Sequence, residues 1–305
     1  MQFGPHLMLA LIEGAVYAAV LTLMASGLSL VFGVMRVVNV AHGEFYMLGA
    51  VVAWAVAGAL GGGPLVAFLA ALVLAPLLVG LLAAAIDLTL LRRLTYDPER
   101  TIVATIGLLY ILQQSTLMLY GPVARPVEAP FNTRFALPWV GENWELIWPW
   151  GLSITSYKIF VVVAAVAVIV GLKLALGRSK AGLVMRATQL DPETAQAFGI
   201  PVGRVYAAVF GVGCALAALA GVLIVPIRQA HYLMGGDALL ASFTVVIIGG
   251  LGSLNGTILA ALIIGMSDGV LSVFFSPILA KIAATLLVAL VLVFRPAGLF
   301  GGKKR

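Results

Sequence analysis

The amino-acid sequence predicts an all-α polytopic membrane protein. Of its 305 residues, 62% are hydrophobic and only 10% are charged, and the mean hydropathy is +1.13. Soluble domains carry about 25% charged residues, so this composition excludes a soluble enzyme and a disordered chain. The apolar segments run unbroken instead of alternating with polar residues, which argues against a membrane β-barrel. The 34 glycines fit helices that approach one another closely in lipid.

The apolar runs predict about nine membrane-spanning helices, with a range of eight to ten, in one transmembrane domain over residues 1–305. A helix needs roughly 20 apolar residues to cross the hydrocarbon core of a bilayer. The first run reads as a retained span, because it lacks the basic start and small-residue cleavage site of a signal peptide. The runs cover residues 7–33, 41–60, 64–91, 101–120, 155–176, 205–226, 238–253, 256–275 and 278–295.

The basic residues predict the orientation of these spans. Cytoplasmic loops are enriched in Lys and Arg. With nine spans, a periplasmic N-terminus and a cytoplasmic C-terminus, thirteen of the 18 basic residues lie on the inner side. The five on the outer side are Arg125, Arg134, Lys158, Arg228 and Lys281. The net charge of +6 is therefore explained by inner loops and needs no nucleic-acid partner.

The first polar interruption lies between the first two runs, near residues 34–44. It contains Asn39, His42 and Glu44, with Gly43 among them. Non-helical backbone at membrane depth is tolerated only where it is buried in protein or lines a cavity. One interpretation is a discontinuous helix whose polar groups face a solute pathway. The other is a short inner loop in which His42 and Glu44 cap the next helix.

A long segment at residues 121–154 follows the fourth run and is predicted to be periplasmic. It is rich in proline and contains Trp139, Trp144, Trp148 and Trp150, which are four of the five tryptophans. An aromatic belt with a compact lid at the membrane surface is one interpretation. A docking surface for an external partner is the other.

The longest inner loop covers residues 177–204 and predicts a short helix at 192–198. Asp191 is a good N-cap, Pro192 suits the first helical position, and Glu193 favours the positive end of the helix dipole. Gly199 and Pro201 predict its end. From the residues alone, an ordinary capped loop helix and a functional helix remain open.

The second polar interruption lies at residues 248–256 in the C-terminal half. Gly249, Gly250, Gly252 and Asn255 interrupt an apolar stretch there. Paired interruptions in the two halves of a transporter indicate its pathway. The alternative is a tight hairpin between two helices. The acidic residues Glu13, Asp87 and Asp268 also lie within apolar runs, as ion sites or as packing positions.

The sequence lacks the motifs of common catalytic and metal sites. It has no phosphate-binding loop, no zinc-protease helix and no nucleophile elbow. The single cysteine and three histidines have no metal-ligand spacing. We therefore expect no catalytic residue, no bound metal and no cofactor on this chain, and any ATP that drives it must bind to another subunit.

Four stretches resemble the LivH type of branched-chain amino acid ABC permease. The stretch from Gly27 to Gly49 resembles the start of that family, and residues 186–200 resemble its cytoplasmic loop. Residues 246–256 and 294–300 are similar to its late glycine-rich motif and its C-terminal ending. The matches occur in the family's order over nearly the whole chain.

This resemblance implies a permease subunit of an ATP-driven importer in the bacterial inner membrane. The expected solutes are branched-chain amino acids or related amino acids, amides, urea or aromatic acids. The expected partners are a second homologous permease subunit, two ATP-binding subunits that hold ATP and Mg²⁺, and a periplasmic solute-binding protein. The ATPase-coupling residues implied are Arg186, Thr188, Asp191, Pro192, Glu193, Ala195, Phe198 and Gly199.

Two other classes of function compete with this interpretation. A secondary transporter or channel that works alone would need a coupling-ion site, for which Asp87 and Asp268 are candidates. An intramembrane enzyme would need a catalytic group, and only Arg36, His42 and Glu44 lie close together, without a nucleophile.

Overall fold

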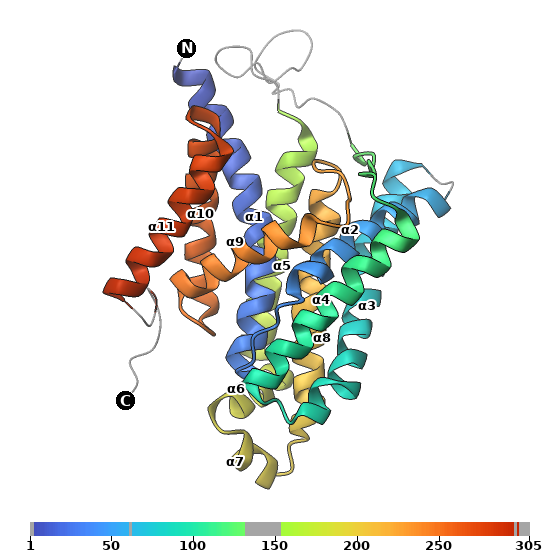
Figure 1. The fold of residues 1–305 in the computed structure, drawn as a ribbon, viewed down its shortest axis with the longest axis vertical. Coiled ribbons are helices and arrows are strands. Elements are labelled where there is room, and N and C mark those ends of the chain that lie inside the picture. The colour runs from blue at the N-terminus through green and yellow to red at the C-terminus, as the bar shows by residue number, and fades with distance from the viewer. Residues whose placement is uncertain (1–2, 61–62, 132–153, 296–297, 299–305) are drawn as a thin grey trace.

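The computed structural model describes residues 3–60, 63–131, 154–295 and 298, and within these ranges the regular structure is helical. Figure 1 shows an elongated bundle in which α1 begins at one end and the short helices α6 and α7 lie at the other. In chain order the elements are α1 (Phe3–Met35), α2 (His42–Ala59), α3 (Pro64–Thr89), the 3-10 helix η1 (Leu91–Leu94), α4 (Pro98–Tyr120), α5 (Ser156–Arg178), α6 (Lys180–Leu190), α7 (Pro192–Ala197), α8 (Val202–Ile224), α9 (Met234–Gly249), α10 (Leu254–Phe274) and α11 (Pro277–Phe294).

Six described helices are long and apolar enough to cross a membrane: α1, α3 (continued by η1), α4, α5, α8 and α10. The described part of α11 and the 16-residue α9 are shorter apolar helices. α2 has 18 residues but carries His42 and Glu44 in its first turn. The structure thus confirms an all-α membrane protein, and the exact count of nine spans stays a prediction.

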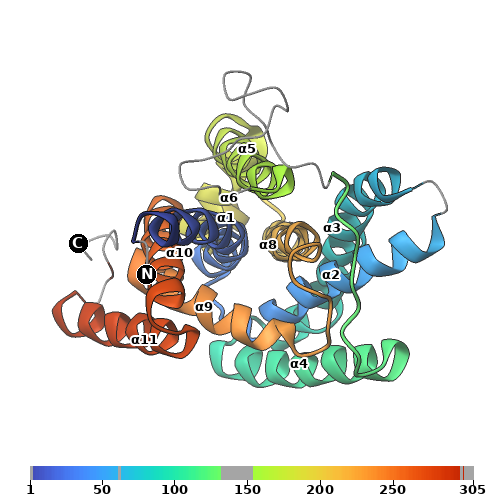
Figure 2. The same cartoon turned by 90° about the horizontal axis from the view of Figure 1, so that it is seen from above.

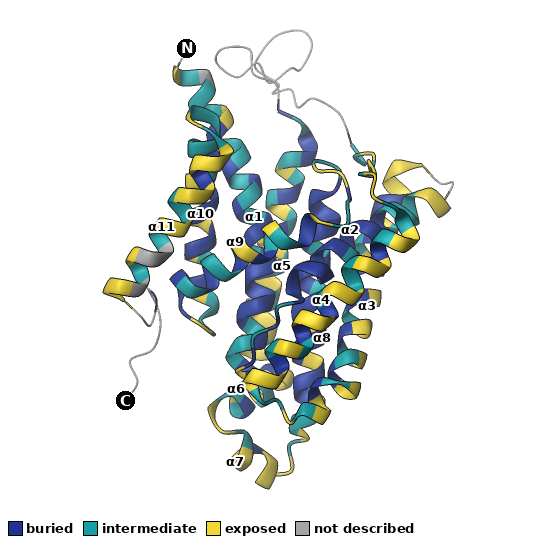
Figure 3. Ribbon diagram, viewed as in Figure 1, coloured by how far each residue is buried: buried dark blue, intermediate teal, exposed yellow. Residues whose placement is uncertain are grey.

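Two buried helices, α1 and α8, form the centre of the bundle (Figures 2 and 3). They cross so closely that a Cβ atom on Gly27 would lie 2.2 Å from the carbonyl oxygen of Gly213. α10 packs along α1, and α3 packs along α8. Small residues permit this approach, since packing of helices in lipid depends on close contact of their backbones.

The two central helices, α1 and α8, are followed by the same order of elements. Each ends in a non-helical connection, at residues 36–41 after α1 and 225–233 after α8, and each connection leads into a shorter helix. α2 then packs against α8, and α9 packs against α1. In Figure 1, α1 descends and α8 ascends, so the two sets run in opposite directions. This is the arrangement of an inverted repeat, in which broken helices meet inside the protein.

The second polar interruption, at residues 248–256, joins α9 to α10. Residues 250–253 form a tight turn between α9 and α10, with Gly250 and Gly252 at φ values of 99° and 79°. Ser253 caps α10 by accepting a hydrogen bond from the Gly256 amide. Glycine adopts these dihedral angles without strain. The alternative of a hairpin is what the structure contains, and the counterpart of residues 36–41 is the connection 225–233.

The predicted periplasmic segment 121–154 is only partly described. Residues 125 and 230 form an isolated antiparallel bridge, and the guanidinium carbon of Arg125 lies 5.2 Å from the ring centre of Trp54. The bridge attaches residues 121–131 to the connection 225–233, and the contact with Trp54 attaches them to α2. The tryptophans at 139, 144, 148 and 150 lie outside the described residues, so their roles as a belt or a docking surface stay predictions.

Candidate functional site

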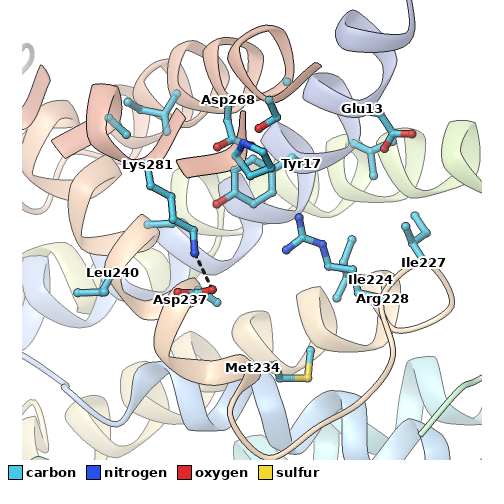
Figure 4. A pocket seen from close by; sticks show the side chains of 18 of the residues that line it. Glu13, Tyr17, Ile224, Ile227, Arg228, Met234, Asp237, Leu240, Asp268 and Lys281 are labelled. Atoms are coloured by element: carbon cyan, nitrogen blue, oxygen red, sulfur yellow. Dashed lines mark hydrogen bonds and ion pairs between the residues drawn. The ribbon is translucent and has the colours of Figure 1, made fainter. Parts of the chain in front are cut away.

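A cavity of about 590 Å³ lies between the helices, toward the end where α1 begins. Its walls come from α1, the connection 225–233, α9, α10 and α11, with Tyr46 contributed by α2 and Ile224 by the end of α8 (Figure 4). This volume falls within the range of about 300–1,000 Å³ that is typical of small-molecule sites. Its polar lining residues are Glu13, Tyr17, Tyr46, Arg228, Gln229, His231, Asp237, Thr244, Asp268, Ser272, Lys281 and Thr285.

Two ion pairs at the cavity neutralise four charges. Lys281 Nζ lies 2.9 Å from Asp237 Oδ2 and joins α11 to α9. Glu13 pairs with Lys158 and joins α1 to α5. Ion pairs lower the cost of charges within a membrane protein, since an unpaired charge at membrane depth is expensive.

One cation and one anion at the cavity are left outside these pairs. Within the described ranges, neither Arg228 nor Asp268 takes part in a salt bridge. The Arg228 guanidinium carbon lies 5.7 Å from the ring centre of Tyr17, a cation–π distance. Asp268 interacts with the hydroxyl group of Ser272, one turn further along α10.

The rest of the cavity wall is apolar. Its aliphatic residues come from both central helices and from the helices around them. A cavity of this kind can hold a small solute that has both charged and aliphatic groups. The apolar lining includes Val16, Ile224, Ile227, Met234, Leu240, Ala241 and Ile264.

The predicted break between α1 and α2 is buried in protein. Asn39 is fully buried, and its Oδ1 atom accepts a hydrogen bond of 3.1 Å from the Ala41 amide. Its Nδ2 atom lies 3.7 Å from Cys214 Sγ on α8. The Val40 amide donates to Thr105 Oγ1 on α4. Side chains therefore satisfy backbone groups that the helix leaves free, as a membrane interior requires.

The start of α2 is equally buried. His42 Nε2 lies 3.0 Å from the Met24 carbonyl oxygen on α1. Both carboxylate oxygens of Glu44 are buried without a hydrogen-bond partner in the described structure. Gly43 lies against Gly235, where α9 begins.

The structure brings the residues of this break together, but it does not place them on the wall of the cavity. Asn39, His42, Gly43 and Glu44 are absent from the cavity lining, whereas Tyr46 belongs to it. Gly249, Gly250, Gly252 and Asn255 lie at the opposite end of α9, where Gly252 contacts Gly33. A role of either group in the solute pathway stays a prediction.

The loop helix predicted at residues 192–198 is observed as α7, Pro192–Ala197. The Asp191 carboxylate accepts hydrogen bonds from the Thr194 hydroxyl and from the amides of Glu193 and Thr194. These bonds, led by that of the Thr194 hydroxyl, hold the pKa of Asp191 below its usual value. Gly199 follows at φ 84°, as the C-terminal signal predicts.

The other residues of the predicted coupling set either hold this loop in place through their contacts or are exposed on its surface. Arg186 donates to the Leu176 carbonyl oxygen, and Thr188 and Ala195 are buried. Phe198 is 83% exposed and Leu190 is 81% exposed. Two large apolar side chains are thus exposed beside α7. This helix lies at the end of the bundle opposite to the start of α1 (Figure 1).

The chain matches the family described as branched-chain amino acid transport system / permease component over residues 10–294. The chain therefore belongs to this permease family. It is a transport subunit, and its apolar helices agree with a multi-pass membrane protein.

Three relatives match almost the whole length of this permease. It is 27% identical to the high-affinity branched-chain amino acid transport system permease protein BraD of Pseudomonas aeruginosa, over 97% of the chain and 96% of the relative. It is 29% identical to the LivH permease protein of Escherichia coli, over 95% and 94%. A probable LivH permease of Methanocaldococcus jannaschii is 26% identical, over 95% and 92%.

Sequence reasoning did not identify the cavity of this permease. Glu13 and Asp268 stood out as isolated acidic residues, and Arg228 and Lys281 only as charges on the outer side. Asp87, the third such acid, lies away from the cavity and accepts a hydrogen bond of 3.2 Å from the Tyr96 hydroxyl. The available signal was the clustering of Arg228, His231 and Asp237 just before one short apolar run.

Proposed function

We propose that this permease is the membrane-spanning subunit of an ATP-driven importer in the bacterial inner membrane. It translocates branched-chain amino acids, or a related small solute such as another amino acid, an amide, urea or an aromatic acid. A periplasmic solute-binding protein delivers the solute. The observation that carries this proposal is a cavity with charged and aliphatic walls inside the helix bundle of a family permease.

We infer the other subunits of the transporter from the sequence of this chain and from its exposed surface. A second homologous permease, or a second copy, completes the membrane domain. Two ATP-binding subunits bind ATP and Mg²⁺, since this sequence contains no phosphate-binding loop. The exposed Leu190 and Phe198 beside α7 supply an apolar surface for docking an ATP-binding subunit.

Uptake of labelled amino acids tests this function. In cells that lack the gene for this chain, uptake of leucine, isoleucine and valine should fall to background and return when the chain is restored. Replacing the phosphate-loop lysine of the ATP-binding subunits should abolish the restored uptake. Uptake by this chain alone, driven by an ion gradient, would instead establish the stand-alone transporter.

Cysteine labelling tests the orientation, with a periplasmic N-terminus and a cytoplasmic C-terminus. Val123 follows α4 and is 64% exposed, and Gln196 in α7 is also exposed. In a Cys214→Ser background, an impermeant maleimide added to spheroplasts should label Val123→Cys and leave Gln196→Cys unlabelled until the cells are lysed. The reverse pattern would invert the topology.

A further inference from the structure

We propose that the cavity binds the zwitterionic head of an aliphatic α-amino acid, with Arg228 holding the carboxylate and Asp268 the ammonium group. This assignment rests on the proposed function and names the groups that recognise the solute.

The charges on the cavity wall do not all pair with one another directly. Three carboxylates and two cations line the cavity. Glu13 is paired with Lys158 outside the cavity wall, and Asp237 is paired with Lys281 within it. The remainder is one guanidinium and one carboxylate. These two groups attract each other without forming a salt bridge, so a zwitterionic ligand between them can bring the complementary charge to each.

The two groups outside the ion pairs reach the cavity from different elements. Arg228 belongs to the connection 225–233, while Asp268 lies on α10. Figure 4 shows both side chains entering the cavity on either side of the Tyr17 ring. The Tyr17 ring lies at 5.7 Å from the Arg228 guanidinium carbon and supports that side chain. A guanidinium group presents a planar fork that binds a carboxylate through two parallel hydrogen bonds.

Apolar side chains surround the two charged groups on the cavity wall. Ile224 and Ile227 precede Arg228 in the chain, and Met234 follows it at the start of α9. Val16 and Ile264 contribute from α1 and α10. An aliphatic side chain can therefore be buried against the wall while its charged head meets the polar groups. Urea and simple amides carry neither the two charges nor this aliphatic group.

Binding by the purified permease pair in nanodiscs tests this assignment without the selectivity of the binding protein. The probes are leucine, its 2-oxo acid, which lacks the ammonium group, and 3-methylbutylamine, which lacks the carboxylate. Thermal stabilisation gives the half-saturating concentration of each probe. Leucine should bind about tenfold more tightly than either analogue, since each analogue loses one charge-assisted interaction.

Two variants separate recognition from a structural role. Asp268→Asn should remove the advantage of leucine over the oxo acid, and Arg228→Met should remove its advantage over the amine. Arg125→Met removes a cation at the same end of the bundle but outside this cavity, and it should keep the wild-type order. The assignment is wrong if both cavity variants keep the preference for leucine, or if the variants weaken the binding of all three probes equally. It is also wrong if leucine does not stabilise the wild-type pair. The proposed function fails separately, if the complete wild-type transporter imports no amino acid, amide, urea or aromatic acid.

Discussion

A permease carrying Phe198→Asp should insert and fold like the wild type but support less than about one tenth of its transport. Phe198 is 83% exposed at the end of α7 and contributes little to the permease's own core. In the assembled transporter we expect it to be buried against an ATP-binding subunit. A carboxylate there would have to be desolvated without a partner, which is strongly unfavourable. The measurements are co-purification of the ATP-binding subunit and ATP-dependent leucine uptake.

Matched variants sharpen this test. Phe198→Leu keeps an apolar side chain and should retain most of the transport. Asp191→Ala removes the N-cap of α7 and should weaken docking less than Phe198→Asp does, because the apolar contact remains. If the Phe198→Asp permease co-purifies and transports like the wild type, this loop does not dock the ATP-binding subunit.

The α7 helix could be predicted to within a residue because its signals are local. Asp191, Pro192 and Gly199 each act on dihedral angles or hydrogen bonds within a few positions of the chain. The break after α1 was also predictable, since polar residues interrupt an apolar run there. The residues that contact this break could not be predicted, because the contacts of Asn39 with Cys214 and of Val40 with Thr105 join distant parts of the chain.

The cavity depends on such distant contacts entirely. Tyr17, Arg228 and Asp268 come from the first and the last thirds of the sequence, and the packing of both α8 and α10 along α1 brings them together. The partner of the first helix break was not predicted for a related reason. Glycines at 249–252 fit either an interruption or a hairpin and serve a tight turn, whereas the break at 225–233 reads as an ordinary loop.

The joint between the two shorter helices gives the second large expected effect. α2 and α9 meet at their first turns, where a Cβ atom on Gly235 would lie 2.7 Å from the Gly43 carbonyl oxygen and 2.8 Å from Glu44 Oε1. Backbone cannot move aside as a flexible side chain can. Gly235→Ala should therefore destabilise the permease by about 1–3 kcal/mol, the usual cost of overpacking a well-packed interior.

The adjacent glycine provides the control for this joint. A Cβ atom on Gly236 would meet nothing within 4 Å, so Gly236→Ala should leave stability unchanged or raise it by about 0.5–1 kcal/mol through its helix propensity. The melting temperature of the purified permease and leucine uptake by the transporter are measured for both variants. Because α9 carries Met234 and Asp237 into the cavity, a shift at its first turn should also reduce uptake by Gly235→Ala. Equal melting temperatures for the two alanine variants would show that the first turns of α2 and α9 are not in backbone contact.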